Sequence, residues 1–339
     1  MAYSKKRPKK KKEEYTARTH PIHGNYESKK WDYDHHVIPP ITSSTTHRGA
    51  LGFVEFASDE ADRLCKVPIY IYDRLDEPSR GMGREPGLCR GGGVETAVTF
   101  ATGMAAISAA LSVMVAAREE IVAHHILYGC TFSLLTHWLP RCGIKTRFGD
   151  LTVEGELEKL INDRARVVFF ETPTNPNLGI IDIARVKSVL DAINAERPEQ
   201  KRITMIVDNT FATPYCQRPI RYGADPVVHS LTKDIGGFGA DMGGVVIAPQ
   251  SLYNHLLLYR KDFGGVLSPK SAWIFWSMAF LLWPPAWSIS RRVPFGSPVF
   301  WKNTLRWPEF VTRGWSLFLS MSWLDIKWWA TTASLPLAA

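Results

Sequence analysis

The chain has few cysteines for its 339 residues, and none of them forms a CxxC pair or a set with metal-binding spacing. The five are Cys65, Cys89, Cys130, Cys142 and Cys216. An odd, scattered set of this kind predicts reduced thiols in a cytoplasm. The amino terminus also lacks the apolar stretch of a secretory signal, so no signal peptide is expected. These absences favour a cytoplasmic protein.

The chain has little net positive charge outside one short segment, although the formal net charge is +8. Residues 5–12 supply seven positive charges, so the rest of the chain is close to neutral. A terminal run of like charge is usually a solvated tail. It could contact nucleic acid or an anionic surface, but no aromatic cluster or reading helix accompanies it. We therefore expect no nucleic-acid partner.

The chain also lacks a convincing membrane span. The best candidate, residues 273–283, is too short and is closed by Pro284 and Pro285. We therefore expect no membrane partner.

Short apolar runs alternate with helical segments through the middle of the chain. The runs lie near residues 121–124, 166–170, 203–207 and 226–229. An alanine-rich segment that opens at Gly103 predicts a buried helix, and residues 185–195 predict another. Strands that alternate with helices predict an α/β fold with a mostly parallel central sheet and covering helices on both faces. The hydrophobic content of 45% is enough for such a core.

Polar side chains follow these runs, at the edge where a parallel sheet binds its ligands. Asp208 ends one run, while Ser230, Thr232 and Lys233 end the next. A lysine amine can form a Schiff base with pyridoxal phosphate (PLP), a carboxylate can pair with its pyridinium nitrogen, and hydroxyls can bind its phosphate. The sequence therefore predicts a PLP site in which Lys233 carries the cofactor.

Both central residues also have ordinary structural interpretations. Lys233 could be a surface lysine after a strand, but the valines before it and Gly236 and Gly237 after it favour a tight, buried turn. Burial near other positive charge helps an amine to lose its proton. Asp208 could merely close an Asx turn. A carboxylate after five apolar residues is costly to bury unpaired, which favours a cationic partner.

Three further features bear on this site. Free amides at Gly103 and Met104, where the alanine-rich helix begins, can bind phosphate, although the glycine could be only a cap. Tyr128 could stack on the cofactor ring and act as an acid or base, although a lone tyrosine is more often a packing residue. We interpret His124 and His125 as structural, because adjacent strand residues point to opposite faces and no carboxylate accompanies them. No metal site is predicted.

Six ordered blocks resemble the PLP-dependent enzymes of cysteine and methionine metabolism. This family includes methionine gamma-lyase, cystathionine gamma-synthase, cystathionine lyases and homoserine-ester sulfhydrylases. The blocks are 100–107 (FATGMAAI), 127–132 (LYGCTF), 170–177 (FETPTNPN), 207–214 (VDNTFATP), 228–233 (VHSLTK) and 262–269 (DFGGVLSP). The resemblance extends over residues 35–273.

The resemblance implies a fold-type I PLP-dependent transferase architecture and a homotetramer of paired dimers. It implies that Lys233 binds the cofactor covalently and that Asp208 pairs with the pyridinium nitrogen. It further implies that Tyr128 stacks on the ring and that Asn175 bonds the phenolic oxygen.

The same resemblance implies a phosphate site. Its residues are Gly103, Met104, Ser230 and Thr232. Tyr72 and Arg74 match a motif that reaches the phosphate of the neighbouring subunit. Glu77 stands where that motif usually has an asparagine, so the local turn departs from the family pattern.

The division of the chain follows from the extent of the resemblance. Residues 1–66 form a basic tail and an irregular arm, and residues 67–273 form the PLP-binding large domain. Residues 274–339 are atypical: ten of the twelve tryptophans lie between Trp273 and Trp329. Nothing there resembles the family's C-terminal small domain, which supplies the arginine for the substrate carboxylate.

A second stretch also departs from the family. Residues 84–93 contain Pro86 and four glycines where the family has a helix, and this composition disfavours one. Our hypothesis is that this stretch and residues 274–339 are out-of-frame translation.

The implied reaction is gamma-elimination or gamma-replacement on a sulfur amino acid or a homoserine ester. Lys233 would remove the Cα proton, and Tyr128 would help the γ-substituent to leave. Cys130 either lies near the substrate, as in methionine gamma-lyase, or is an inert small core residue. Two alternatives stay open: a catalytically impaired remnant that binds PLP but lacks the substrate-carboxylate site, and a less favoured protein that interacts with nucleic acid or a membrane.

Overall fold

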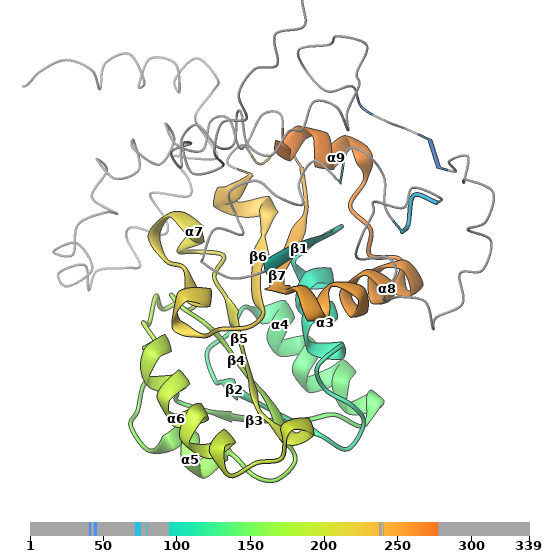
Figure 1. Cartoon of the computed structure of the whole chain (residues 1–339). Helices are drawn as coiled ribbons and strands as arrows, with labels where there is room; N and C mark the ends of the chain where they lie inside the picture. Colours follow the sequence, from blue (N-terminus) through green and yellow to red (C-terminus); the bar gives the residue numbers. More distant parts are fainter. Residues whose placement is uncertain are drawn as a thin grey trace, which may run out of the picture. The chain divides into compact units, whose positions relative to one another are not determined.

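The computed structural model describes residues 41, 44–45, 72–75, 80, 95–236, 239 and 241–276 (Figure 1). The predictions for residues 1–12, 84–93 and 277–339 lie outside the described residues. Among the helices that the structure describes, none has the length and hydropathy needed to cross a bilayer.

One mixed sheet organises the described part of the chain. Its strands are β1 (Glu95–Phe100), β2 (Glu120–His124), β3 (Lys145–Gly149), β4 (Ala165–Glu171), β5 (Thr204–Asp208), β6 (Val227–Ser230) and β7 (Gly244–Pro249). They lie in the order β1-β7-β6-β5-β4-β2-β3. Strand β7 is antiparallel to β1 and β6, and the neighbours from β6 to β3 are all parallel. The prediction of a mostly parallel sheet is confirmed.

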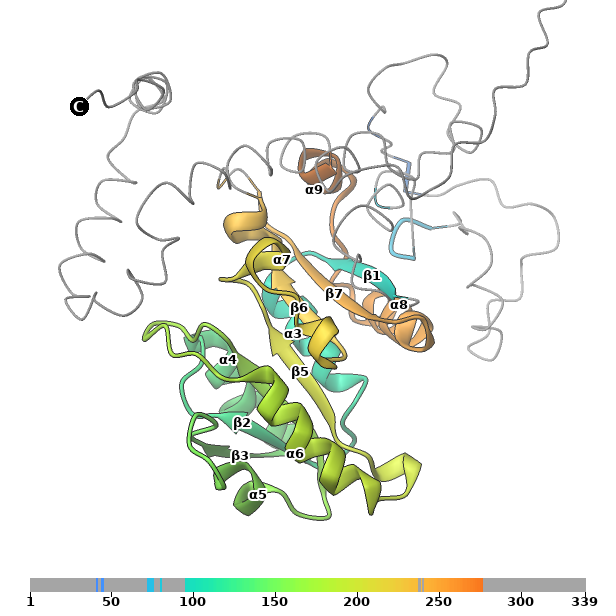
Figure 2. The same ribbon diagram turned by 60° about the vertical axis from the view of Figure 1, so that its left-hand side comes forward.

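Helices cover both faces of this sheet (Figures 1 and 2). The α-helices are α3 (Gly103–Ser112), α4 (Gly129–Ser133), α5 (Glu156–Leu160), α6 (Ile183–Ala195), α7 (Thr213–Cys216), α8 (Tyr253–Phe263) and α9 (Pro269–Ile274). Short 3-10 and π segments are η3 (Leu134–Trp138), η4 (Leu139–Cys142), η5 (Glu199–Lys201), η6 (Pro219–Tyr222), η7 (Leu231–Ile235) and η8 (Gln250–Leu252). Helices α3 and α8 lie on one face, and α5 and α6 lie on the other. The predicted helices at Gly103 and at residues 185–195 are therefore α3 and α6.

Strand β4 shows why its sequence is apolar almost throughout. Val167 and Phe169 pack in the cluster that contains α3, whereas Val168 and Phe170 pack in the cluster that contains α6. All four side chains are fully buried. A strand with two covered faces loses the alternation of an exposed strand, so the apolar run itself marks the centre of the sheet.

The four predicted runs do not include β1, β3 or β7. Strand β3 is at the edge of the sheet, and its Lys145 and Arg147 are exposed. Strand β7 is inserted antiparallel between β1 and β6, a pairing that depends on contacts between residues distant in sequence.

The parallel strands place three polar residues at one edge of the sheet. Glu171, Asp208 and Ser230 are the last residues of β4, β5 and β6. Helix α3 begins at the same edge, directly after β1. The carboxyl edge of the sheet therefore carries the predicted site residues, as expected for a fold of this type.

Two glycines let α3 begin close against the sheet. A Cβ atom on Gly103 would lie 2.8 Å from the Cβ of Ser230, and one on Gly244 would lie 2.2 Å from the carbonyl oxygen of Thr102. Thr102 is the N-cap, and its Oγ1 accepts a hydrogen bond of 3.0 Å from the amide of Ala105. The capped helix start is thus held against the end of β6.

Candidate active site

Two carboxyl groups lie side by side at the carboxyl edge of the sheet. Glu171 and Asp208 are register partners at the ends of β4 and β5. Burial, and then the charge of Asp208, raise the pKa of Glu171 to about 8. Burial also raises the pKa of Asp208, although hydrogen bonds from Thr210 act in the opposite direction. Among the described residues, neither carboxyl group forms an ion pair.

This pair of carboxyls fits a cationic ligand. Two neighbouring carboxylates that are removed from water repel each other, so at least one proton is retained unless a positive charge is supplied. The Asp208 carboxyl is fixed by hydrogen bonds to its Oδ1 from the amide and the hydroxyl of Thr210, at 2.9 and 2.5 Å. A protonated pyridine nitrogen is a ligand group that would supply the missing charge at Asp208.

The Asx turn considered for Asp208 is present. The hydrogen bond from the Thr210 amide to the Asp208 side chain is the bond that defines such a turn. The turn does not exclude a cationic partner for Asp208, since it leaves Oδ2 without a hydrogen-bond partner among the described residues. The turn orients the carboxyl group, and the second oxygen is available to a ligand.

Glu171 brings two other predicted residues to the same place. Its Oε1 accepts a hydrogen bond of 2.7 Å from the backbone amide of Tyr128, and its carboxyl group also accepts one from the backbone of Asn175. A hydrogen bond with Cys130, its charge, burial and the charge of Glu171 all raise the pKa of the Tyr128 phenol. The phenol therefore holds its proton well above neutral pH.

Cys130 is exposed, and its thiol forms a hydrogen bond with Tyr128 and no disulfide. The interpretation of Cys130 as a core residue is therefore wrong: it lies in the first turn of α4, beside Tyr128.

A cradle for phosphate forms where α3 meets β6. Among the described residues, the amides of Gly103 and Met104 have no hydrogen-bond partner, as expected for the first turn of a helix. Ser230 lies against Gly103, and its amide donates to Oγ1 of Thr210 at 2.9 Å. Free amides at a helix start and a nearby hydroxyl are the groups that bind phosphate. Both ends of the predicted cofactor, the pyridinium and the phosphate, thus find suitable partners.

Thr232 and Lys233 lie in η7, just beyond the end of β6. Oγ1 of Thr232 accepts a hydrogen bond of 3.1 Å from the amide of Gly243, so this hydroxyl is partly occupied within the chain. Lys233 has non-helical backbone angles inside η7 and is exposed, between the buried Leu231 and Ile235. The expectation of a buried turn is therefore wrong for the lysine side chain, because the open edge of the sheet leaves it accessible.

Tyr72 and Arg74 lie apart from this constellation. The Arg74 guanidinium stacks on the Tyr72 ring, 4.9 Å from its centroid, and both residues are exposed. The turn is tied to α8 and β1 through Arg260, which donates hydrogen bonds to the carbonyls of Leu75 and Thr99. Within the described ranges, no hydrogen bond or ion pair joins Tyr72 or Arg74 to the groups above.

The two histidines behave differently from the prediction. Strand β2 ends at His124, so His125 does not follow the strand alternation, and the two ring centroids are 4.6 Å apart. A carboxylate does accompany them, with Oδ1 of Asp150 lying 3.9 Å from Nδ1 of His124. That nitrogen already accepts a hydrogen bond from the amide of Leu151 at 3.1 Å. The reason given for the structural interpretation is therefore wrong: a carboxylate is present, and the three ligand atoms lie within 4.8 Å of one another.

Sequence reasoning assigned no role to the residues that link the loops. Thr210 joins Asp208 to Ser230. Asn209 is fully buried and exchanges hydrogen bonds with Gln217, which also donates to the carbonyl of Thr172. The position of Asn209 and Thr210 directly after a buried strand was the available signal for such a role. Their partners, Gln217 and Ser230, could not be identified without the fold.

Comparison with known proteins gives one family. A family model described as "Cys/Met metabolism PLP-dependent enzyme" matches residues 18–277. The L-methionine gamma-lyase of Pseudomonas deceptionensis is 36% identical over 245 residues, which is 70% of this chain and 57% of that protein. The O-acetyl-L-homoserine sulfhydrylase of Leptospira meyeri is 38% identical over 192 residues, 56% of this chain and 41% of that protein.

Solved structures agree. The crystal structure of metB from Corynebacterium glutamicum matches with a TM-score of 0.68 and 28% identity, covering 80% of this chain and 65% of that one. The chain spans about half the length of the curated relatives it matches.

Proposed function

Since the chain belongs to the PLP-dependent enzymes of cysteine and methionine metabolism, we propose that it catalyses gamma-elimination or gamma-replacement on a sulfur amino acid or a homoserine ester. The observation that carries this proposal is a partly buried carboxyl at Asp208, which has no cationic partner among the described residues, together with a phosphate cradle at Gly103 and Ser230. The names of the relatives make methionine the first substrate to test.

The chain's own residues would hold the cofactor at both ends. Asp208 would accept a hydrogen bond from the pyridinium nitrogen, and Asn175 would donate to the phenolic oxygen. The amides of Gly103 and Met104 would bind the phosphate, together with the hydroxyls of Ser230 and Thr232. When bound, PLP supplies a sink for the electron pair released as the Cα–H bond of the substrate breaks.

Two side chains would move the protons. The amine of Lys233 would hold the cofactor at rest and would take the proton from Cα of the substrate. The phenol of Tyr128 would stack on the ring and donate a proton to the leaving group at the γ-carbon. Its raised pKa, caused first by the hydrogen bond with Cys130, keeps it protonated for this purpose.

The wider setting is proposed on the same basis. Residues 67–273 would form the PLP-binding domain of a cytoplasmic enzyme, and two copies of the chain would pair so that Tyr72 and Arg74 reach the phosphate of the neighbouring subunit. The exposed stacked pair is available for such a contact.

The test combines a spectrum with a substrate panel. Purified protein should show the visible absorbance of lysine-bound PLP, and Lys233→Ala should lose it. Lys159→Ala is the matched control, because Lys159 is an exposed lysine on α5 whose partner is Glu156. Release of 2-oxobutanoate and ammonia from methionine, cystathionine or O-acetyl-homoserine would identify elimination, and a new thioether would identify replacement. A protein with no visible band, or a band that Lys233→Ala retains, would contradict the proposal.

A further inference from the structure

We propose that Glu171 is a positioning residue that ties the two loops holding the cofactor ring to a common point. Its carboxyl group accepts the backbone amide of Tyr128 at 2.7 Å and also accepts a backbone hydrogen bond from Asn175. The inference rests on the proposed function, in which Tyr128 stacks on the ring and Asn175 bonds its phenolic oxygen. It adds a third residue that does not touch the ring.

The two loops need such a point because each is fixed internally but not to the other. Helix α4 begins at Tyr128 as its N-cap, and no side chain from within the helix caps it. The loop after β4 is closed on itself by Thr174, whose Oγ1 accepts the amide of Gly179 at 2.8 Å. Glu171 is the contact shared by both segments, so the length of its side chain sets their separation.

The location of Glu171 makes it a rigid anchor. It is the last residue of β4, and only 5% of its surface is exposed. The titratable groups that face it are Asp208 from β5 and Tyr128 from the loop after β2, which in turn contacts Cys130. Glu171 has no ion pair among the described residues. The hydrogen bonds that its carboxyl group accepts come from the backbone of Tyr128 and of Asn175.

A role in positioning differs from a role in charge, and two substitutions separate them. Glu171→Gln keeps the length and the accepting oxygen but removes the charge. Glu171→Asp keeps the charge but withdraws the carboxyl by one methylene. If reach matters, the glutamine variant behaves like the wild type and the aspartate variant does not.

The experiment measures the cofactor's environment as well as its affinity. Full-length apoprotein is titrated with PLP, and the circular dichroism of the visible band reports how the ring is held. Glu171→Asp is expected to weaken PLP binding by about tenfold, the effect of losing one or two hydrogen bonds, and to reduce the visible dichroism. Glu171→Gln is expected to remain within about threefold of the wild type. Far-ultraviolet dichroism checks that each variant is folded.

Glu120→Gln is the matched control. Glu120 is also a buried glutamate at a strand end, but it lies at the opposite edge of the sheet and bonds Arg147 and Asn162. Its substitution should leave PLP affinity and visible dichroism unchanged.

Failure of the inference is distinguishable from failure of the proposed function. A wild-type protein without a visible band would reject the function, and the inference with it. Two outcomes would overturn the positioning role while leaving the function intact. In one, the normal band is unchanged in Glu171→Asp. In the other, the band is lost in Glu171→Gln but kept in Glu171→Asp. If Glu171→Asp does not fold, Glu171→Ala takes its place with the same tenfold loss expected, and a Glu171→Ala variant that binds PLP as tightly as Glu171→Gln would overturn the inference.

Discussion

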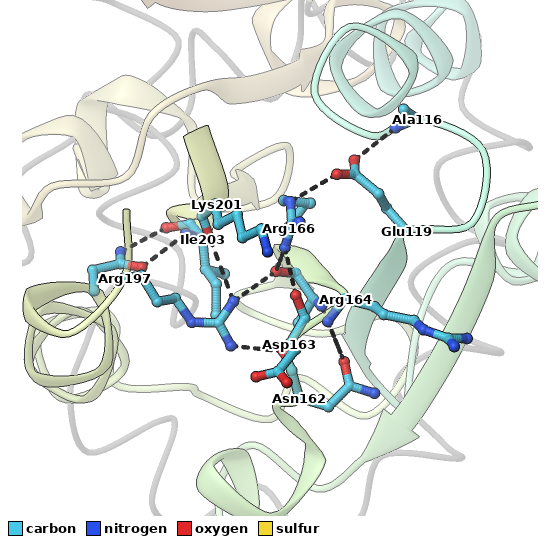
Figure 3. A network of polar contacts seen from close by, with 11 residues as sticks. Ala116, Glu119, Asn162, Asp163, Arg164, Arg166, Arg197, Lys201 and Ile203 are labelled. Carbon is cyan, nitrogen blue, oxygen red and sulfur yellow. Dashed lines mark hydrogen bonds and ion pairs between the residues drawn. The ribbon is translucent and has the colours of Figure 1, made fainter. Parts of the chain in front are cut away.

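The two edges of the sheet treat buried charge in opposite ways. At the amino edge, where β2, β4 and β5 begin, acids and bases are matched (Figure 3). Arg166 pairs with Glu119 at 2.7 Å, and Arg147 pairs with Glu120 at 2.6 Å. At the carboxyl edge, Glu171 and Asp208 lie together with no described cation between them. The acids of the first edge are ion-paired, whereas the two carboxyls of the second have no ion-pair partner among the described residues.

Two glutamates make the contrast quantitative. Burial acts to raise the pKa of Glu120, but hydrogen bonds from Arg147 and Asn162 and the nearby arginine charges outweigh it, so the pKa is lowered. Burial raises the pKa of Glu171 to about 8, and the neighbouring Asp208 adds to the rise. A glutamate at a strand end is thus ion-paired at one edge of the sheet, whereas at the other edge its raised pKa keeps it protonated. The difference teaches that unmatched buried charge marks the ligand site.

The largest expected effect comes from removing the charge that would meet the cofactor. Asp208→Asn should lower turnover by about 10²–10³-fold, because the pyridinium loses its partner. Steady-state kinetics on the substrate identified by the panel would measure this. Glu158→Gln, an exposed change on α5, is the control. Asn209→Asp would not be a suitable one, because Asn209 bonds Gln217 and so holds the loop after β5. Equal turnover in Asp208→Asn and wild type would show that the carboxylate of Asp208 is not needed by the cofactor, and the contrast between the two edges would then have no functional meaning.

At the amino edge the effect should fall on stability instead. Glu120→Ala should lower the free energy of unfolding by about 1–3 kcal/mol, because a buried acid that bonds Arg147 and Asn162 is lost. Urea unfolding measures the change, and Glu158→Ala should stay within about 0.5 kcal/mol of the wild type. Loss of the cofactor band in folded Glu120→Ala would show that the two edges are not independent.

The pH dependence of the apoprotein should report the carboxyl edge. The pKa of Glu171 is raised from an ordinary value of 4.5 to about 8. Between these values the folded state keeps a proton that the unfolded state has released, so this contribution to stability is full below pH 4.5 and is lost as the pH rises to about 8. Urea unfolding at a series of pH values would show the decline, and Glu171→Gln should flatten it. A decline of equal size in the variant would assign the effect to another group.

The smallest effect should come from the hydroxyl that links the two halves of the cofactor site. Thr210→Val removes a donor to Asp208 and an acceptor for the Ser230 amide, and should cost about 1 kcal/mol of apoprotein stability. Thr210→Ser keeps the hydroxyl and is the matched control. Thermal unfolding of the three proteins would measure the difference, and equal losses in both variants would assign it to the methyl group.

Much of the site could be predicted because its residues follow apolar runs. A run such as residues 203–207 predicts a buried strand, and the polar residue that follows it is expected at the sheet's edge. This argument places Asp208 and Ser230 correctly. It fails for the exposure of Lys233 and for the position of His125, because both depend on where a strand stops and what covers its end.

The sequence by itself determined the family, the mostly parallel sheet and the edge at which its polar residues gather, since hydrophobic periodicity and local motifs are properties of neighbours along the chain. Only the tertiary structure decided which charges are paired. Glu120 and Glu171 look alike in the sequence, but their partners come from other strands and loops. The pKa of a buried acid depends on those partners, and they are brought within hydrogen-bond distance only by folding.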